Sequence, residues 1–264
     1  MNKQEIDSFK KKEESYRTPS LYHYTSTIDN VANILKEKKL YPQFCSENLW
    51  TKINPHLGFG IPQICCCDIP VSMARTMRRQ YGNFAIAFSK EWGIDKGFNP
   101  IFYIQDERVI NSYLVLYDLA NKYLNKKAEI IGLNENDVNN YYRERVDYNS
   151  SMNFVFGYIK KYKGEWRNEE YCNYKENEWR YIVKDGTLLP NNKTIRWKTA
   201  EEYKKWRGNG NKPEISEDLK KCALKFSYDD ITDILVEKGK LEEMKNLINS
   251  FQITDSEKQK LTKL

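Results

Sequence analysis

The hydrophobic and polar positions of this chain follow two periods, and the points where the period changes mark the ends of predicted strands and helices. Near the start, a short apolar segment at residues 21–24 (Leu-Tyr-His-Tyr) is followed by a polar turn, and apolar residues then recur at helical spacing. Ser26 stands where a helix N-cap is expected, and Asp29 three residues later completes a pattern that resembles a capping box. The pattern therefore predicts a strand over residues 21–24 and a helix over residues 26–38.

The same two periods predict most of the remaining elements. Thr199 and Glu202 form a second capping-box pattern, which predicts a helix beginning there. Strands are expected over residues 63–67, 84–88, 101–104, 175–183, 224–226 and 231–236, and further helices over residues 72–81, 108–126 and 241–248.

Three segments give less regular patterns. Residues 58–62 (Gly-Phe-Gly-Ile-Pro) predict a turn, residues 127–150 a polar insertion or a second short helix, and residues 154–162 fit either a strand or a helix. Because strands and helices are mixed without the regular alternation of a doubly wound sheet, we expect an α+β fold. The simplest organisation is a charged N-terminal arm over residues 1–17 and a single domain over residues 18–264, with a mixed, mainly antiparallel sheet and helical decorations.

Composition narrows the class of protein. Hydrophobic residues make up 40% of the 264 positions and aromatic residues 14%, which is enough for a sizeable core, while a mean hydropathy of -0.80 indicates a polar surface. No apolar run reaches the length of a membrane span, and the charged N-terminus does not resemble a secretory signal. The net charge of +6 permits a nucleic-acid partner without requiring one, since the lysines are spread over predicted helix faces. We expect a soluble, cytoplasmic protein without membrane association.

The six cysteines do not predict a metal site. Three of them are adjacent at residues 65–67, a spacing at which they cannot chelate one metal as C-x-x-C pairs do, and the two histidines, His23 and His56, are not spaced to help. We expect the cysteines to be small buried hydrophobes in a reducing compartment, and we expect no metal.

The sharpest chemical signal is a pair of glutamates in the strand predicted over residues 175–183. Side chains two positions apart share one face of a strand, so Glu176, Glu178 and Arg180 are expected on one exposed face. Trp179 and Tyr181 are then expected on the buried face. One carboxylate of such a pair can stabilise a developing cation while the other orients or deprotonates a nucleophile. The alternative is that Glu178 and Arg180 form a surface ion pair, which contributes roughly 0–1 kcal/mol.

Other candidate residues also have structural alternatives. His23 lies at a strand-to-helix junction, where a side chain can point into a cleft or simply hydrogen-bond a turn. Tyr81 can stack on a ring in a cleft or pack beneath the sheet. Asp68 is expected as a helix N-cap rather than as a ligand contact.

His-Tyr-Thr at residues 23–25, followed by a helix containing Ile-Leu, resembles the opening of ADP-ribosyltransferase-like domains. The resemblance implies that His23 holds the adenosine ribose of NAD and that Glu178, with Glu176 in a Glu-x-Glu arrangement, acts at the nicotinamide ribose. Tyr24, Thr25 and Tyr81 are then further candidates for NAD binding.

A closer resemblance, to the bacterial abortive-infection family AbiGi, rests on six segments in order. They are Leu-Tyr-His-Tyr-Thr-Ser at 21–26, Cys-Asp-Ile-Pro-Val-Ser at 67–72, and segments at 81–88, 99–103, 176–180 and 230–236. Together they span most of the chain. This resemblance implies a role in phage defence, where the family is described as an antitoxin partner.

Three functions follow as hypotheses. The first is an NAD-dependent enzyme of phage defence, an ADP-ribosyltransferase or NAD glycohydrolase, with Glu178, Glu176 and His23 as catalytic residues. The second is a non-catalytic antitoxin or sensor that binds a partner toxin or a phage component. The third, carried only by the basic charge, is nucleic-acid binding.

Overall fold

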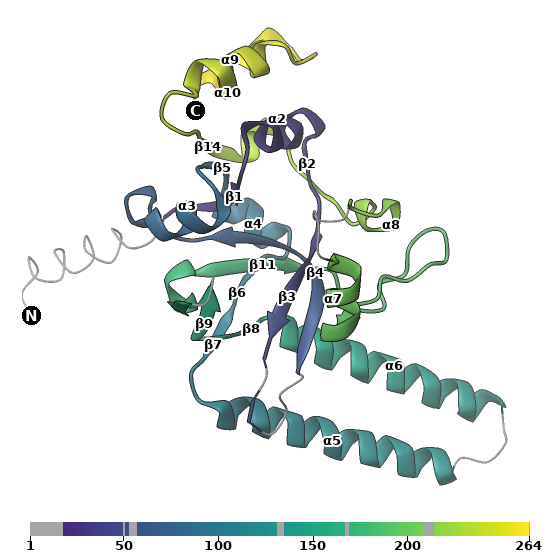
Figure 1. Ribbon diagram of the computed structural model, residues 1–264. Helices are drawn as coiled ribbons and strands as arrows, with labels where there is room; N and C mark the ends of the chain where they lie inside the picture. The colour runs from purple at the N-terminus through teal and green to yellow at the C-terminus, as the bar shows by residue number, and fades with distance from the viewer. Residues whose placement is uncertain are drawn as a thin grey trace, which may run out of the picture.

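A computed structural model describes residues 18–49, 51–52, 57–130, 135–166, 169–208 and 214–263. In this part of the chain eight strands form one sheet, in the order β14-β5-β1-β4-β11-β6, with β3 and β12 both paired to β4 (Figure 1). All pairs in this sheet are antiparallel, and only the small β7–β8 ladder is parallel. The α+β class and the mainly antiparallel sheet are therefore confirmed. The predicted arm at residues 1–17 and His56 lie outside the described residues.

The elements of the first half of the chain, in order, are β1 (Ser20–Thr25), α2 (Ile28–Glu37), β2 (Lys39–Leu40), β3 (Gln43–Asn48), β4 (Gly58–Cys67), η1 (Val71–Met73), α3 (Arg75–Tyr81), β5 (Phe84–Ser89), α4 (Lys90–Asp95), β6 (Asn99–Pro100), β7 (Phe102–Ile104) and α5 (Glu107–Ile130). Those of the second half are α6 (Glu135–Gly157), β8 (Ile159–Lys161), β9 (Lys163–Trp166), β10 (Glu169–Cys172), η2 (Asn173–Glu176), β11 (Glu178–Ile182), β12 (Lys198–Thr199), α7 (Ala200–Arg207), α8 (Glu217–Lys220), β13 (Leu224–Lys225), η3 (Tyr228–Asp230), β14 (Ile231–Leu235), α9 (Leu241–Asn249) and α10 (Asp255–Lys263).

The two faces of the sheet bury different side chains. Residues paired across neighbouring strands share a face, so the partners Tyr22, Cys67 and Glu178 define face A. Leu21 and Trp179, one position along, lie on the opposite face B. Face B packs under α2, α4 and α9 in the largest apolar cluster. Face A is covered by α3, the end of α6 and the β8–β10 segment.

The long strand β4 joins the two parts of the sheet. One edge of β4 pairs with β11 at residues 63–67, and the same edge pairs with β12 at residues 59–60. Its other edge pairs with β3 over residues 58–63, but it pairs with β1 only at Cys67. The prediction of a turn over residues 58–62 was wrong, because these residues are held in the ladder by strands on both edges.

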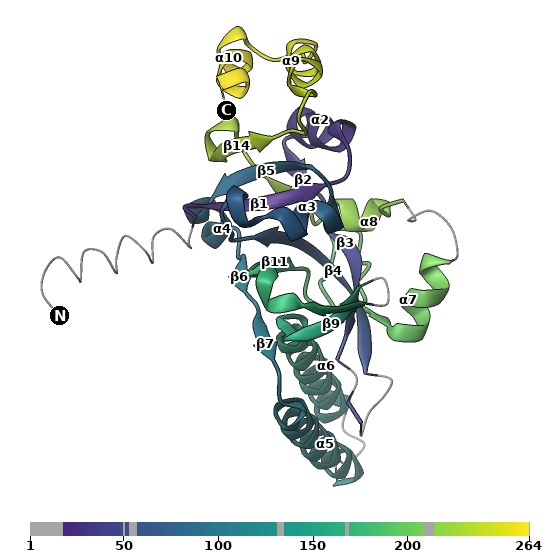
Figure 2. The same ribbon diagram turned by 60° about the vertical axis from the view of Figure 1, so that its left-hand side comes forward.

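A pair of long helices, α5 and α6, extends away from the sheet (Figures 1 and 2). It contains the segment predicted as a polar insertion with at most a short helix; the prediction was too modest, because α6 begins at Glu135 and continues to Gly157. At its end α6 approaches β11 closely: a Cβ at Gly157 would lie 2.7 Å from the Ile182 side chain. Residues 154–162, left open between strand and helix, contain the end of α6 followed by β8.

Two helix starts differ from their predictions. The α2 N-cap is Thr27, whose hydroxyl accepts the Asn30 amide, rather than Ser26 with Asp29. The helix predicted from Ser72 begins as the 3-10 turn η1, and α3 starts only at Arg75. The predicted end of this helix at residue 81 is confirmed: Gly82 follows it with a φ of +116°, and a Cβ there would collide with the Thr25 carbonyl oxygen.

The later elements follow the sequence pattern more closely. The capping box of Thr199 and Glu202 is present at the start of α7. The strands β13 and β14 and helix α9 confirm the three late predictions, and α10 was not predicted.

Candidate functional site

A network of buried charged side chains lies on face A, between the sheet and the base of the α5–α6 pair. On β11, the Arg180 guanidinium donates to both oxygens of Glu178, with its Nε 2.6 Å from Oε1. The same guanidinium contacts Glu47 of β3 at 2.7 Å. Lys160 of β8 completes the network, with its Nζ 2.9 Å from Glu178 and 2.6 Å from Glu176.

The network ties the helix pair to the sheet. Arg180 Nη1 donates to the carbonyl oxygen of Gly157, the last residue of α6, at 2.7 Å. Lys160 follows three residues later on β8 and binds the two glutamates. The position of α6 is therefore fixed by charged hydrogen bonds as well as by packing.

The charges of the network do not balance when every group is ionised. Three carboxylates, on Glu47, Glu176 and Glu178, face two cations, on Lys160 and Arg180. Burial raises the pKa of Glu178, but Arg180 and Lys160 outweigh burial and hold its pKa well below the ordinary value. Burial raises the pKa of Glu176 to about 7, against the opposing charge of Lys160. A proton on Glu176 thus removes the excess negative charge near neutral pH.

The two glutamates come together, but not as predicted. Glu176 ends the 3-10 turn η2, Asn177 adopts a left-handed conformation with φ of +41°, and the strand begins only at Glu178. Lys160 therefore bridges the two carboxylates, in place of a continuous strand. The expected exposed face was wrong: Glu176 and Glu178 are 3% and 4% exposed and Arg180 is fully buried. In the alternative, the ion pair between Glu178 and Arg180 is confirmed, but its expected place at the surface was wrong, because both side chains are buried.

Tyr81 links the network to the surface. Its hydroxyl donates to Glu176 Oε1 at 3.3 Å, while the residue remains 39% exposed at the end of α3. Burial of the hydroxyl and the neighbouring Glu176 charge raise the pKa of Tyr81 well above its ordinary value. Of the two roles left open for Tyr81, packing beneath the sheet does not describe its position, because its side chain spans from the buried carboxylate to solvent.

His23 lies on the other side of the sheet from the glutamates. It pairs with Ile86 of β5, a member of the face B cluster, and is one position along β1 from Tyr22 of face A. Its Nδ1 lies 2.9 Å from the carbonyl oxygen of Cys65, which can only accept, so Nδ1 carries the proton. Cys65 lies where β4 has left β3 and has not yet paired with β1. His23 therefore satisfies a backbone group at this gap in the ladder.

The two residues after His23 also have structural contacts. Thr25 accepts a hydrogen bond from Asn30 of α2 at 2.8 Å. Tyr24 lies on face A beside Cys67 and Met77, and its buried hydroxyl has no hydrogen-bond partner among the described residues. Of the six predicted site residues, the structure brings Glu176, Glu178 and Tyr81 into one network and does not bring His23 to it.

Asp68 does not cap a helix. It accepts a hydrogen bond from the Thr18 amide at 3.3 Å and forms an ion pair with Lys90 at 2.7 Å. It therefore ties the start of the described chain to α4.

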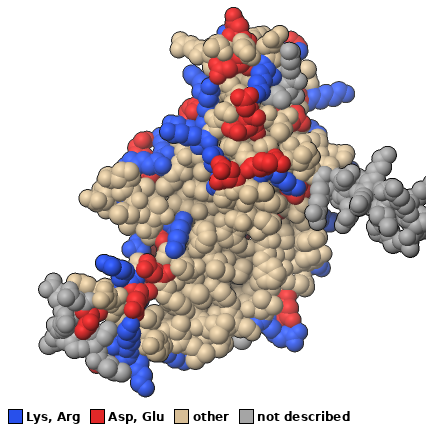
Figure 3. Space-filling model, turned by 180° about the vertical axis from the view of Figure 1, so that it is seen from behind, with Lys and Arg blue, Asp and Glu red and all other residues tan. Residues whose placement is uncertain are grey.

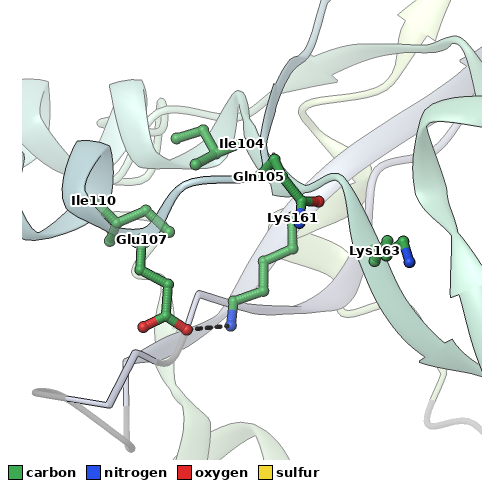
Figure 4. A pocket seen from close by; sticks show the side chains of 6 residues that line it. All are labelled: Ile104, Gln105, Glu107, Ile110, Lys161 and Lys163. Carbon is green, nitrogen blue, oxygen red and sulfur yellow. Dashed lines mark ion pairs between the residues drawn. The ribbon is translucent and has the colours of Figure 1, made fainter.

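A pocket of about 170 Å³ lies near the base of the helix pair, away from the predicted residues (Figure 4). Its lining residues are Ile104, Gln105, Glu107, Ile110, Lys161 and Lys163. Lys161 pairs with Glu107 at 3.8 Å across it, and burial lowers the pKa of the lysine. Because a carboxylate and two amines share this small space, the pocket has no single charge preference.

Two exposed features were missed by the sequence analysis. The first, here called the α5 stripe, consists of apolar side chains that are 45% to 70% exposed: Val109, Val115, Leu116, Leu119 and Tyr123. The second, here called the arginine face, consists of Arg75, Arg78 and Arg79 on α3. Helical spacing could have revealed both, had the outward positions been examined as well as the inward ones.

Figure 3 shows the back of the molecule, where charged side chains gather toward the two ends and few lie between them. Within the described ranges, no group of three His, Cys, Asp or Glu side chains is arranged to hold a metal ion. In the same part of the chain, no helix has the length and apolar character needed to cross a membrane.

The comparisons with known proteins identify a family. Residues 38–237 match the family described as "Putative abortive phage resistance protein AbiGi, antitoxin". A protein of Lactococcus lactis subsp. cremoris named "Abortive phage resistance protein AbiGi" is 29% identical over an alignment of 156 residues, and the match covers 53% of this chain and 60% of that protein. The chain thus spans less than two thirds of this relative. No solved structure matches, and the ADP-ribosyltransferase-like fold stays a prediction. Because the family match covers most of its length, this chain belongs to the AbiGi family.

Proposed function

We propose that this chain is a non-catalytic antitoxin of phage defence and that it binds a partner toxin protein through the α5 stripe. The family description supplies the word antitoxin, which implies a partner toxin, and direct binding is the simplest way to counteract it. The observation that carries the proposal is the apolar α5 stripe, whose side chains are exposed to solvent and are not covered by any other described part of the chain.

The α5 stripe lies opposite the face of α5 that packs against the rest of the protein. Ile110, Tyr113 and Leu114 of that packed face join an apolar cluster with Phe156 of α6. Leu116, Leu119 and Tyr123 follow one another at spacings of three and four residues, so they form one row along the helix. Exposed apolar rows of this kind mark surfaces that bind proteins.

The charges beside the stripe favour one kind of partner segment. Lys122 and Lys126 follow one margin of the row, and Lys126 makes no ion pair within the described residues. An amphipathic helix of the toxin, with an apolar face and acidic side chains along its edge, complements both the row and this margin. A second copy of this chain would bring the same lysine-rich margin and is the less favourable occupant.

The test uses the product of the gene adjacent to this one as the probe. We expect it to co-purify with the chain on co-expression, and the chain to restore growth when that product is toxic. Leu116→Ser combined with Leu119→Ser should weaken the complex at least about tenfold, since each buried leucine contributes roughly 1.5–3 kcal/mol.

The matched control replaces two equally exposed apolar residues elsewhere, Ile94→Ser with Leu188→Ser. The control should keep the complex within about threefold of the unsubstituted chain. Equal losses in both variants, or no complex in either form, would contradict the proposal. A change from dimer to monomer in the stripe variant without any toxin would assign the stripe to a second copy instead.

An NAD-dependent activity remains the second candidate, supported by the opposite pKa displacements of Glu176 and Glu178. Two neighbouring carboxyl groups whose pKa values are displaced in opposite directions are typical of catalytic acid and base pairs. The arrangement does not fit NAD as the resemblance implies, because His23 faces away from the glutamates and both carboxylates are enclosed. Labelled NAD gives the test: release of nicotinamide that is lost in Glu176→Gln would support this candidate, and no release would reject it.

A further inference from the structure

The short helix α3 concentrates positive charge on one side. Arg75, Arg78 and Arg79 are spaced three and four residues apart, so their side chains share one face of the helix. Arg75 and Arg79 are exposed, and Arg78 is half-buried. Figure 2 shows α3 at the front of the molecule, over β1.

This arrangement is unfavourable for the helix by itself. Like charges at these spacings repel, and α3 has neither an acidic residue in its first turn nor a side-chain cap. Arg75 also begins the helix, where the helix dipole disfavours a cation. None of the three side chains makes a hydrogen bond or ion pair with another described residue.

Other groups of cations in the described chain are placed differently. Lys220 and Lys221 of α8 each pair with a carboxylate three residues earlier. Lys204 and Lys205 of α7 lack ion pairs, but they lie in the last turn, where the helix dipole favours cations. Arg78 and Arg79 likewise lie in the last turn of α3, so the dipole disfavours only Arg75, at the start of the helix. The arginine face therefore differs from these groups in having a cation at its helix start and three cations on one face of a single short helix.

Two exposed apolar groups flank the arginines. The Tyr81 ring follows Arg78 by three residues and is partly exposed, although its hydroxyl is held by Glu176. Met73, which is 54% exposed, lies just before the helix. Arg78 is the arginine that stands one helical turn from Tyr81. Cationic groups together with an exposed aromatic ring are the combination by which proteins bind single-stranded nucleic acids, with the cations on phosphates and the ring on a stacked base.

We propose that the arginine face binds the phosphate backbone of a single-stranded nucleic acid, with Tyr81 stacking on one base. The planar guanidinium binds a phosphate through two parallel hydrogen bonds, and the net charge of +6 adds long-range attraction. An acidic protein surface would use the arginines but would have no need of an exposed ring beside them. The proposal is separate from toxin binding, which uses α5.

The experiment measures binding of a fluorescently labelled 20-nucleotide RNA of mixed sequence by anisotropy, at several salt concentrations. In Arg75→Ala with Arg79→Ala, the dissociation constant should rise at least about tenfold at low salt. The slope of log affinity against log salt should fall by about 1.4, that is, about 0.7 for each lost phosphate contact on a single strand. The matched control, Lys204→Ala with Lys205→Ala, removes the same exposed charge and should change affinity less than about threefold.

A charge-preserving pair, Arg75→Lys with Arg79→Lys, should retain most of the binding, and circular dichroism confirms that each variant is folded. The proposal is overturned if the unsubstituted chain shows no salt-dependent binding, or if the arginine and lysine variants lose affinity equally. It is also overturned if RNA binding survives in the arginine variant while binding of the adjacent gene product is lost. That last result would make α3 part of the toxin interface.

Discussion

The two faces of the central sheet are built from alternate residues of the same strands, yet they are stabilised differently. On β11, Trp179 packs on face B within the large apolar cluster, while its neighbours Glu178 and Arg180 enter the ionic network of face A. Apolar packing is insensitive to pH and tolerates small changes in shape. A buried ionic network depends on every partner, because a charge left unpaired is costly.

The difference indicates a division of labour. Face B joins β1, β4, β5 and β11 to the covering helices and contains the largest apolar cluster of the described chain. Face A fixes where the α5–α6 pair is attached, through Arg180 and Lys160. The helix pair carries the proposed docking surface, so the ionic network of face A holds in place the part of the protein that is proposed to bind the toxin.

The largest predicted effect comes from removing the central cation of the ionic network on face A. Arg180→Met keeps a similar volume but leaves Glu178 and Glu47 without their shared cation, and should lower the free energy of unfolding by about 3–5 kcal/mol. Leu21→Ala, the matched change on face B, should cost about 2–5 kcal/mol. Urea unfolding of both variants measures the two losses.

Acid should separate these two losses. The low pKa of Glu178 in the folded protein stabilises it above the ordinary carboxyl range, and this stabilisation is lost as the pH falls through the folded pKa. In Arg180→Met this stabilisation by Glu178 is already reduced at neutral pH. The difference in unfolding free energy between this variant and the unsubstituted chain should therefore become smaller in acid, while the difference for Leu21→Ala should stay constant. Equal pH dependence in the two variants would show that the faces do not differ as argued.

The second prediction sharpens the role of Glu176. Its pKa of about 7 lies above the ordinary 4.5, so between these values the folded protein binds more protons than the unfolded chain. Stability should therefore fall as the pH rises through this window. Glu176→Gln removes the titration and keeps the shape. The unsubstituted chain should lose about 1–3 kcal/mol relative to this variant between pH 5 and pH 8, since one pKa unit corresponds to about 1.4 kcal/mol.

Parallel unfolding profiles of the two proteins across this range would contradict the assignment of the excess proton to Glu176. Glu178→Gln gives the contrast, because a carboxyl with a lowered pKa contributes in the opposite direction and at lower pH. The two substitutions together locate which glutamate of the pair is neutral at pH 7.

Much of this architecture follows from the sequence, because short-range signals determine it. The short apolar segments of β1 and β5 and the Thr199–Glu202 capping box specify their elements locally. Residues 58–62 were predicted wrongly as a turn because glycine and proline are typical of turns. In the structure, pairing with β3 and β12 keeps this segment in a strand. No local pattern reports such pairing with distant strands.

The candidate site was predictable only in part. The Glu176–Glu178 pair is visible as a motif, but its burial depends on Lys160 and Glu47, which no spacing connects to it. A charged residue in a sequence gives no sign that a partner far along the chain will enclose it. His23 was prominent for its rarity, and its position on face B follows only from the register of β1 with its neighbours.

The smallest predicted effect concerns His23, which faces away from the network and should leave it intact. His23→Ala removes the donor to the Cys65 carbonyl and should cost about 1 kcal/mol of unfolding free energy, the net contribution of one hydrogen bond. His23→Asn places an amide donor near the position of Nδ1 and should recover part of that loss. Neither substitution should change the pH dependence assigned to Glu176, because the sheet separates the two side chains. The measurement compares His23→Ala with His23→Ala combined with Glu176→Gln, so that only the contribution of Glu176 is followed. A changed pH dependence of this difference would mean that the two faces are coupled through β4, and the separation argued for them would fail.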